Sequence, residues 1–284
     1  MPFKDQLQEK LKDKIPPSLL QKLPAGFQRV GDIIILNLDE SLHTYKNEIA
    51  KVVLELFPSV KTICNKTGGI TGQFREPHIE YLAGKKDTTT IHTESGCQYK
   101  FDVTKIMFAK GNLAERVRIP KQVKKGEIIL DMFAGIGYFS IPLGKLSQPQ
   151  KIYAVELNPI AFKFLQENIK INKLTNVQAI NTDNREAIAQ LIKQKIKVDR
   201  IIMGYLPPPK EFLPAALSII KKGGMIHYED IISVDKKDEE IQLLMQEINA
   251  IAREYNLSAE LITAKSIKSY GPKKDHYVFD VKIV

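Results

Sequence analysis

An acidic residue followed by a glycine-containing loop is the stretch of this sequence with the clearest chemical meaning. Residues 128–130 are apolar β-formers, and Asp131 follows them directly. The loop at 132–138 then contains Gly135 and Gly137. Because neither glycine has a Cβ, the backbone there can approach a ligand closely. The stretch therefore predicts a parallel strand whose carboxyl end meets a nucleotide-like ligand.

Two common phosphate-binding loops do not match this stretch. A dinucleotide-binding loop reads G-x-G-x-x-G, whereas the third small residue here is Ser140. A Walker loop ends in Gly-Lys followed by Ser or Thr, and the sequence contains no such triplet. Asp131 would also repel a pyrophosphate, because both are negatively charged. A carboxylate at this place instead suits a cationic cofactor that bears an amino group.

Three further polar residues follow the next predicted strands. Glu156 ends the second strand, where an acid accepts hydrogen bonds from the ribose hydroxyls of an adenosine. Asp183 and Asn184 follow the third strand and offer an acceptor and a donor to the edge of adenine. Each residue alone could be a helix N-cap. Together with Asp131, in order at successive strand ends, they predict an S-adenosylmethionine pocket.

The elements that must position these residues alternate from residue 126 onward. The predicted parallel strands are 128–131, 151–156, 177–181, 198–203 and 225–228. The helices that follow them are predicted from 138, over 159–172, around 185–194, over 210–221 and over 236–255. Two late strands, 258–267 and 276–284, are predicted to form a hairpin. This order is typical of an α/β fold in which helices cover both faces of a doubly wound parallel sheet.

The first part of the chain has a different pattern and an excess of positive charge. Residues 1–112 are predicted to form a smaller α+β domain, and residues 113–284 the catalytic domain. The net charge is +9, with 21 Lys and Arg against 14 Asp and Glu in residues 1–125, and 21 against 19 in 126–284. The excess predicts an RNA-binding N-terminal domain, although a generally lysine-rich surface would produce the same count.

Composition excludes several other classes of protein. Cys64 and Cys97 are far apart and form no CxxC pair, which argues against a zinc site or a disulfide framework. No apolar run is long enough to span a membrane, and residues 1–6 do not resemble a signal peptide. We therefore expect a cytoplasmic protein without a metal site and without membrane association.

Beyond these single features, the chain resembles one specific group over nearly its whole length. This group comprises the archaeal and eukaryotic enzymes that act on the purine at position 37 of tRNA, which have a class I S-adenosylmethionine-dependent methyltransferase fold. Its two branches are the tRNA (guanine-N1) methyltransferases and tRNA wybutosine-synthesising protein 2. The stretches that carry the resemblance are 72–78, 90–92, 96–97, 101–108, 111–116, 131–138 and 267–272.

Two short stretches favour the second branch. The methyltransferase branch has Asn-Leu-Pro after the fourth strand and an Arg shortly before a Glu-Arg pair. This chain has Met-Gly-Tyr at 203–205 and Lys-Gly-Asn at 110–112 instead. Glu156, where the methyltransferases often have Asp, agrees with this choice. The chain departs from its relatives in the proline-rich loop 206–209 and at Ala109, where they have Ser.

The resemblance implies an aminocarboxypropyl transferase. Such an enzyme moves the 3-amino-3-carboxypropyl group of S-adenosylmethionine to 4-demethylwyosine in the anticodon loop of phenylalanine tRNA and releases methylthioadenosine. Gly204 would leave free space that lets the methionine arm swing toward the base. The catalytic residues would be Asn112, Gly204 and Tyr205. The cofactor-binding residues would be Arg116, Asp131, Phe133, Gly135, Glu156, Asp183 and Asn184.

Individual roles and alternatives follow from the same comparison. Arg116 would grip the methionine carboxylate, Asn112 would orient the base, and Phe133 and Tyr205 would stack on adenine or the target base. Plain structural roles for these four residues remain open. The nearest alternative function is N1-methylation of guanosine at position 37, and a second is a non-catalytic RNA-binding protein that holds S-adenosylmethionine. We expect a monomer.

Overall fold

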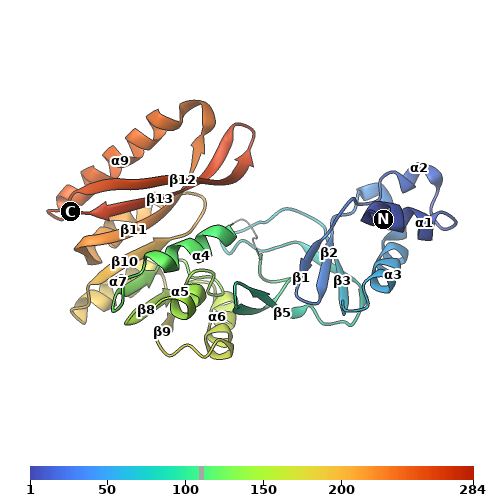
Figure 1. Cartoon of the computed structure of the whole chain (residues 1–284), viewed down its shortest axis with the longest axis horizontal. Coiled ribbons are helices and arrows are strands. Elements are labelled where there is room, and N and C mark those ends of the chain that lie inside the picture. Colours follow the sequence, from blue (N-terminus) through green and yellow to red (C-terminus); the bar gives the residue numbers. More distant parts are fainter. Residues whose placement is uncertain (109–111) are drawn as a thin grey trace. The chain divides into compact units, whose positions relative to one another are not determined.

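The structure is a computed structural model that describes residues 1–108 and 112–284 (Figure 1). The chain divides into two compact units, Met1–Phe108 and Ala109–Val284. Ala109, Lys110 and Gly111, on which part of the choice between the two branches depends, lie outside the described residues. No helix in the described ranges is both long and apolar enough to cross a membrane.

The N-terminal unit packs helices against a small mixed sheet. Its helices are α1 (Phe3–Leu11), α2 (Pro17–Leu20), η1 (Glu40–Tyr45) and α3 (Lys46–Leu56). The four-stranded sheet has the order β1 (Gln28–Val30), β2 (Ile33–Leu36), β3 (Thr62–Lys66) and β4 (Ile79–Gly84). Apolar residues at helical spacing in α1 and α3 bury Leu7, Leu11, Ile49 and Val53 in one core with the sheet. A separate hairpin joins β5 (Thr89–Glu94) to β6 (Cys97–Asp102).

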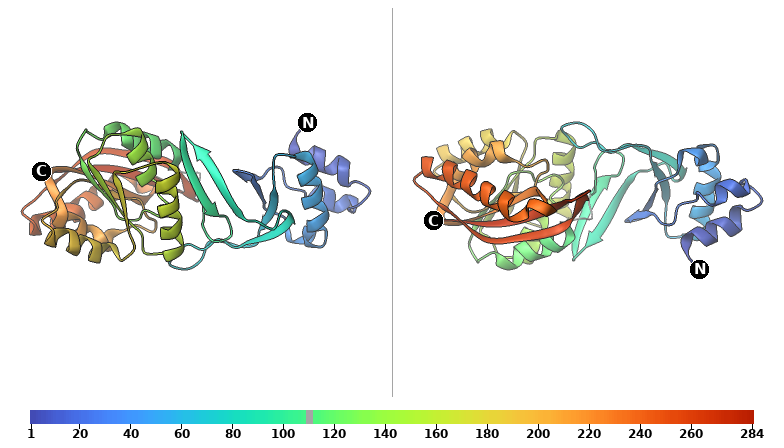
Figure 2. Two further views of the ribbon diagram at one scale, coloured as in Figure 1. Left: turned by 90° about the horizontal axis from the view of Figure 1, so that it is seen from below. Right: turned by 90° about the horizontal axis from the view of Figure 1, so that it is seen from above.

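The C-terminal unit is built on a seven-stranded sheet of order β12-β13-β11-β10-β7-β8-β9 (Figures 1 and 2). The strands are β7 (Ile128–Asp131), β8 (Lys151–Val155), β9 (Val177–Ile180), β10 (Val198–Met203), β11 (Ile220–Ser233), β12 (Ala259–Gly271) and β13 (Lys274–Ile283). Strands β7 to β11 run parallel, and β13 and β12 add an antiparallel pair. The predicted α/β class and doubly wound sheet are confirmed.

Helices cover both faces of this sheet because successive strand residues point to opposite faces. Ile129 packs in one core beneath α4 (Leu113–Gln122), α5 (Ser140–Leu146) and α6 (Pro159–Ile171). Leu130, its neighbour, packs in the other core with α7 (Asn184–Lys193), α8 (Leu213–Ile219) and α9 (Lys237–Glu254). Two short 3-10 turns, η3 (Lys210–Phe212) and η4 (Val234–Lys236), precede the last two helices. Apolar runs in the parallel strands are thus buried on both sides.

Several boundaries differ from the sequence prediction. Helix α5 begins at Ser140 rather than at 138, because the glycine loop extends through Phe139. The predicted strand at 225–228 is the middle of the much longer β11, which pairs with β13 along nine positions from Met225 to Ser233. Helix α4 was not predicted, since Pro120 lies inside it and its residues are largely polar.

The outer strand β12 pairs irregularly with β13. The register shifts at three places along β12, between Leu261 and Thr263, between Ser266 and Lys268, and between Ser269 and Gly271. This strand forms one edge of the sheet, and the four-residue strand β9 forms the other.

Candidate cofactor and substrate site

Asp131 is a fully buried acid at the carboxyl end of β7. Its Oδ2 accepts a hydrogen bond from the Ser140 hydroxyl at 2.6 Å. Its Oδ1 is also buried and has no hydrogen-bond partner among the described residues. Burial raises the pKa of Asp131 to about 7, although hydrogen bonds from Ser140 and Phe133 oppose this rise. A buried carboxyl oxygen with unused accepting capacity suits an ammonium group.

Glu156 links the end of β8 to the glycine loop. Its Oε2 accepts a hydrogen bond from the backbone N–H of Gly135 at 2.7 Å, and its Oε1 accepts one from the N–H of Asn158 at 2.7 Å. Burial raises the pKa of Glu156, and these backbone hydrogen bonds only partly offset it. Gly135 has φ +57°, and a Cβ there would lie 2.7 Å from the Tyr138 ring. The loop therefore keeps its shape only with glycine at this position.

The two polar residues after β9 differ in their surroundings. Asp183 caps α7 by accepting from the N–H of Arg185 at 2.8 Å, and it pairs with the Arg185 guanidinium. The hydrogen bond from the Arg185 side chain lowers the pKa of Asp183. The Nδ2 of Asn184 donates to the carbonyl of Met132, while its buried Oδ1 has no partner in the described part of the chain. Asn184 thus offers a buried acceptor next to the loop that follows β7.

The aromatic residues predicted to stack on a ligand stack on each other. The rings of Phe133 and Tyr205 are nearly parallel, with centroids 5.0 Å apart. Phe212 meets Phe133 edge-on at 5.2 Å, and the guanidinium of Arg185 lies 4.9 Å from the Phe212 ring. The spacing leaves no room for a base between Phe133 and Tyr205. In this arrangement, a base could stack only on an outer face of the pair.

The predicted free space beside Gly204 is occupied. A Cβ at this position, directly after β10, would lie 2.7 Å from the Phe139 ring and 3.5 Å from the Oε1 of Glu229. Phe139 is itself buried. The prediction of an open space there was therefore wrong, because a ring from the start of α5 fills it. A catalytic role for Gly204 stays a prediction.

Asn112 and Arg116 reach this region from α4. The Nδ2 of Asn112 donates to the Oε1 of Glu229 at 2.9 Å. Arg116 is buried, and its guanidinium lies 4.8 Å from the ring centroid of Tyr138 in the glycine loop. The structure thus brings Asn112 and Gly204 together at Glu229, and it brings Arg116 to the loop of Gly135. The roles of these residues toward a ligand stay predictions.

Sequence reasoning missed Glu229 and its partner His276. The Oε2 of Glu229 accepts from the Nε2 of His276 at 3.0 Å, and both side chains are buried. Glu229 comes directly after the stretch predicted as the fifth strand, so it carries the same signal as Asp131 and Glu156. An acid at the carboxyl end of a parallel strand could have pointed to it.

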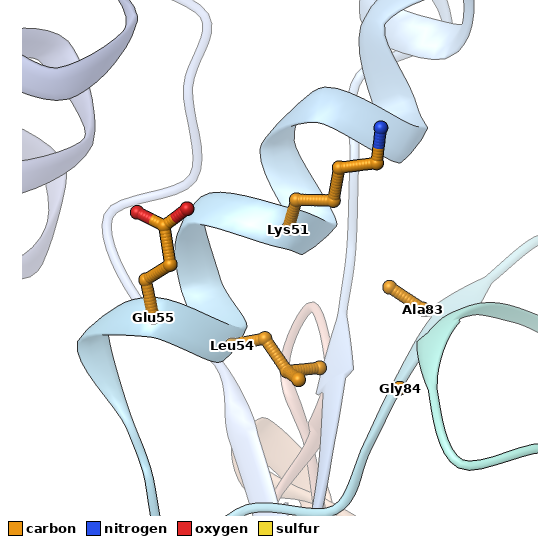
Figure 3. A pocket seen from close by; sticks show the side chains of 5 residues that line it. All are labelled: Lys51, Leu54, Glu55, Ala83 and Gly84. Atoms are coloured by element: carbon orange, nitrogen blue, oxygen red, sulfur yellow. The ribbon is translucent and has the colours of Figure 1, made fainter.

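A hollow in the N-terminal unit contains none of these residues. Its volume is about 360 Å³. Figure 3 shows its lining from α3 and β4, formed by Lys51, Leu54, Glu55, Ala83 and Gly84. Its two charged side chains, Lys51 and Glu55, have opposite signs.

Comparison with known proteins places the whole chain among tRNA-modifying enzymes. A family model described as the TRM5/TYW2 methyltransferase domain matches residues 90–260, and one described as the TYW2 N-terminal domain matches residues 7–88. The tRNA(Phe) (4-demethylwyosine(37)-C(7)) aminocarboxypropyltransferase of Pyrococcus horikoshii is 40% identical over 99% of this chain and 97% of its own length. The tRNA (guanine(37)-N(1))-methyltransferase Trm5b of Pyrococcus abyssi is 34% identical over 95% of this chain and 78% of its own length.

A solved structure shows the same similarity in three dimensions. The crystal structure of P. horikoshii TYW2 in complex with MeSAdo matches with a TM-score of 0.84 and 37% identity. The match covers 99% of both chains.

Proposed function

The chain belongs to the TRM5/TYW2 family, and from that premise we propose that it is a tRNA aminocarboxypropyltransferase. It transfers the 3-amino-3-carboxypropyl group of S-adenosylmethionine to 4-demethylwyosine at position 37 of tRNA(Phe). The observation that carries this conclusion is the 40% identity, over nearly the full length of both proteins, to an enzyme with that activity. The predicted class I S-adenosylmethionine-dependent fold with an N-terminal domain is confirmed.

The site residues fit the cofactor. When bound, S-adenosylmethionine supplies a sulfonium leaving group, so that C7 of the base bonds to Cγ of the methionine arm as the Cγ–S bond breaks, methylthioadenosine departs and the C7 proton is released. The buried Oδ1 of Asp131, which has no partner among the described residues, is suited to the amino group of that arm. The remaining accepting capacity of Glu156 is suited to the ribose hydroxyls. The buried Oδ1 of Asn184 is suited to the adenine amino group.

Other residues of the chain hold the cofactor and the base in position. Arg116, buried over Tyr138, provides a cation for the methionine carboxylate. Gly135 holds the loop close to the cofactor, and the ring pair of Phe133 and Tyr205 offers an outer face on which a base can stack. Catalysis then depends mainly on holding C7 in line with the Cγ–S bond.

The proposal also covers the RNA partner, the oligomeric state and the location of the enzyme. The enzyme acts on tRNA, and it recognises the anticodon loop of the phenylalanine-specific tRNA. Its N-terminal domain, residues 1–112, binds and positions that RNA together with the basic residues that follow it, because the positive excess of residues 1–125 includes several Lys and Arg residues after 112. The enzyme works as a monomer without a metal ion, in the cytoplasm.

Isotope labelling tests the reaction. The full chain is incubated with tRNA(Phe) carrying 4-demethylwyosine and with S-adenosylmethionine labelled in either the methyl or the carboxyl carbon. The proposal expects carboxyl label alone in the RNA, with methylthioadenosine as the by-product. The 34% identity to Trm5b supports N1-methylation of guanosine as the second candidate. Methyl label in the RNA with S-adenosylhomocysteine would establish that candidate, and no label would leave a cofactor-binding protein without catalysis.

A further inference from the structure

Asn112, Glu229 and His276 form a short chain of hydrogen bonds beside Gly204. Asn112 donates from Nδ2 to the Oε1 of Glu229 at 2.9 Å, and His276 donates from Nε2 to the Oε2 at 3.0 Å. The side chain of Glu229 is 5% exposed and that of His276 is 1% exposed. A buried carboxylate therefore has a donor on each of its two oxygens, and one of these donors is a predicted catalytic residue.

The side chain of Asn112 is in an unusual place for its position in α4. Asn112 is the residue that precedes the helix, where an Asn side chain usually accepts from a backbone N–H of the first turn. In the described part of the chain it makes no such cap, and it reaches across to β11 instead. The helix start thus gives up a common local contact, and the amide is bound to a residue 117 positions away.

The chemistry of Glu229 decides which way the Asn112 amide faces. An ionised carboxylate only accepts hydrogen bonds, so the NH2 group of Asn112 and the N–H of His276 must point toward it. The carbonyl oxygen of Asn112 is then directed away from Glu229 and is available as an acceptor. The Nδ1 of His276, on the far side of its ring, is buried and has no partner in the described ranges. Imidazole, carboxylate and amide thus have one consistent set of donors and acceptors.

The carboxylate also borders the residues proposed for the reaction. Its Oε1 lies 3.5 Å from the place where a side chain at Gly204 would begin. Gly204 precedes Tyr205, whose ring stacks on Phe133 of the loop after β7. The group that holds Asn112 therefore lies beside Gly204, which directly follows β10.

We infer that Glu229 is a positioning residue for the transfer reaction: it fixes the Asn112 amide so that the carbonyl oxygen faces the target base. This inference rests on the proposed function, in which Asn112 orients the base. His276 supports the role by holding the second oxygen of the carboxylate. Correct orientation of the base acts on turnover rather than on cofactor binding, because the cofactor contacts come from other residues.

Two conservative substitutions of Glu229 distinguish the effect of its contact with Asn112 from the effect of its negative charge. Glu229→Asp keeps the charge but withdraws the carboxylate by one methylene, so it loses the contact with Asn112. Glu229→Gln keeps an accepting oxygen at the original reach and loses the charge, and His276 can change tautomer to match the new amide. We expect kcat to fall on the order of 10²-fold in Glu229→Asp and to stay near that of the native chain in Glu229→Gln. Cofactor affinity by calorimetry and the thermal midpoint should change little in either.

A double-mutant cycle with Asn112→Ala tests whether Glu229 acts through Asn112. If it does, Glu229→Asp causes little further loss of kcat in the Asn112→Ala background. The matched control is Glu260→Asp, an exposed glutamate on β12 that should leave turnover unchanged.

Losses that multiply in the double variant would overturn the inference. Full activity of Glu229→Asp would also overturn it. An equal loss of kcat in Glu229→Gln would overturn it as well, because it would show that the charge of Glu229 matters rather than its contact with Asn112. Both labels are followed in every assay. The label that the native chain transfers to the RNA tests the proposed function. The kcat values of the double-mutant cycle are then measured with that same label.

Discussion

Asp131 and Glu156 show how two carboxyl groups can share one small site and differ in surroundings. Glu156 accepts two backbone N–H groups, whereas Asp131 accepts from the Ser140 hydroxyl on Oδ2 and its Oδ1 has no partner among the described residues. The negative charge of Glu156 also contributes to the raised pKa of Asp131. In the absence of a cation, burial therefore disfavours the ionised form of Asp131. A bound ammonium group would lower its pKa again.

The pKa of Asp131 predicts that cofactor affinity depends on pH. The ammonium of the methionine arm requires the ionised form, and that form becomes the majority only above about pH 7. We expect affinity to rise about tenfold between pH 5.5 and 7, a range below the titration of an α-amino group. Calorimetric titrations across this range measure the effect. Asp131→Asn provides the control, since it should bind weakly with little dependence on pH; an equally flat profile in the native chain would contradict the assignment.

The positions of Asp131 and Glu156 at the ends of β7 and β8 could be predicted, because an acid after an apolar run is visible in the sequence. Their roles toward the cofactor stay predictions. Glu229 carries the same signal, but its contact with Asn112 depends on α4, which was not predicted. The space beside Gly204 was misjudged because no local pattern shows that Phe139 turns into it.

At the scale of elements, α4 is fixed to the sheet by a buried network of charges. Arg118 on α4 forms a two-pronged pair with Asp280 on β13. Asp280 also accepts from His227 on β11, and the Nε2 of His227 faces Arg200 on β10 at 2.7 Å. Arg200 in turn pairs with Glu127. Since Asn112 and Arg116 belong to the same helix region, this network sets where they lie.

The pKa values in this network predict loss of stability in acid. Burial raises the pKa of Asp280, but hydrogen bonds from Arg118 and His227 outweigh it and hold the pKa well below its usual range. Its contribution is therefore present above about pH 4 and lost below that value. Burial lowers the pKa of His227, so its contribution is lost as pH falls below about 6.5. Both groups therefore lower the free energy of unfolding as the pH falls.

Asp280→Asn should lower the free energy of unfolding by about 3 kcal/mol at pH 7, because Arg118 then loses a buried partner charge. Urea unfolding between pH 7 and pH 3 measures the free energy of unfolding of the native chain and of Asp280→Asn. The native chain should lose stability in acid, and the difference between the two chains should shrink below about pH 4. A constant difference over the whole range would show that Asp280 contributes by packing alone. Asp275→Asn, on the same strand but not buried, is the matched control.

The order of the elements could be predicted better than their ends. Strand–helix alternation was sufficient for the parallel strands β7 to β11, because each strand needs a crossover before the next. The hairpin of β12 and β13 was predicted nearly at its observed bounds. The length of β11 could not be predicted, since it depends on pairing with β13 about 50 residues away, such as His227 with Asp280. Helix α4 was not predicted, because Pro120 lies inside it and half of its ten residues are polar.

At the scale of the whole molecule, the two units have separate cores and different charge. The N-terminal core is formed by α1, α3 and the small sheet, while the C-terminal cores lie on the two faces of the large sheet. The predicted cofactor residues all belong to Ala109–Val284. Met1–Phe108 has 15 Lys and Arg against 13 Asp and Glu, whereas Ala109–Val284 has 27 against 20, so most of the net positive charge lies in the second unit. We therefore expect cofactor binding to need only the second unit and RNA binding to need both.

The fragment Ala109–Val284 tests this separation. We expect it to bind S-adenosylmethionine with nearly the affinity of the full chain, because the pocket and its cores are retained. It should bind tRNA at least about tenfold more weakly at low salt, and its affinity should depend less on salt, since it makes fewer phosphate contacts. Calorimetry and filter binding at two salt concentrations measure both affinities. Equal tRNA binding by fragment and full chain would refute an RNA-binding role for the N-terminal domain.

The irregular edge strand β12 has a consequence for the behaviour of the protein at high concentration. An unpaired strand edge of 13 residues is a template on which another copy could add a strand. Three register shifts interrupt the even row of hydrogen-bonding groups on β12, and the exposed Lys268 adds a charge to it. A second chain would find no long straight ladder to join. The sheet can thus end in an open strand that offers a poor template to a second copy.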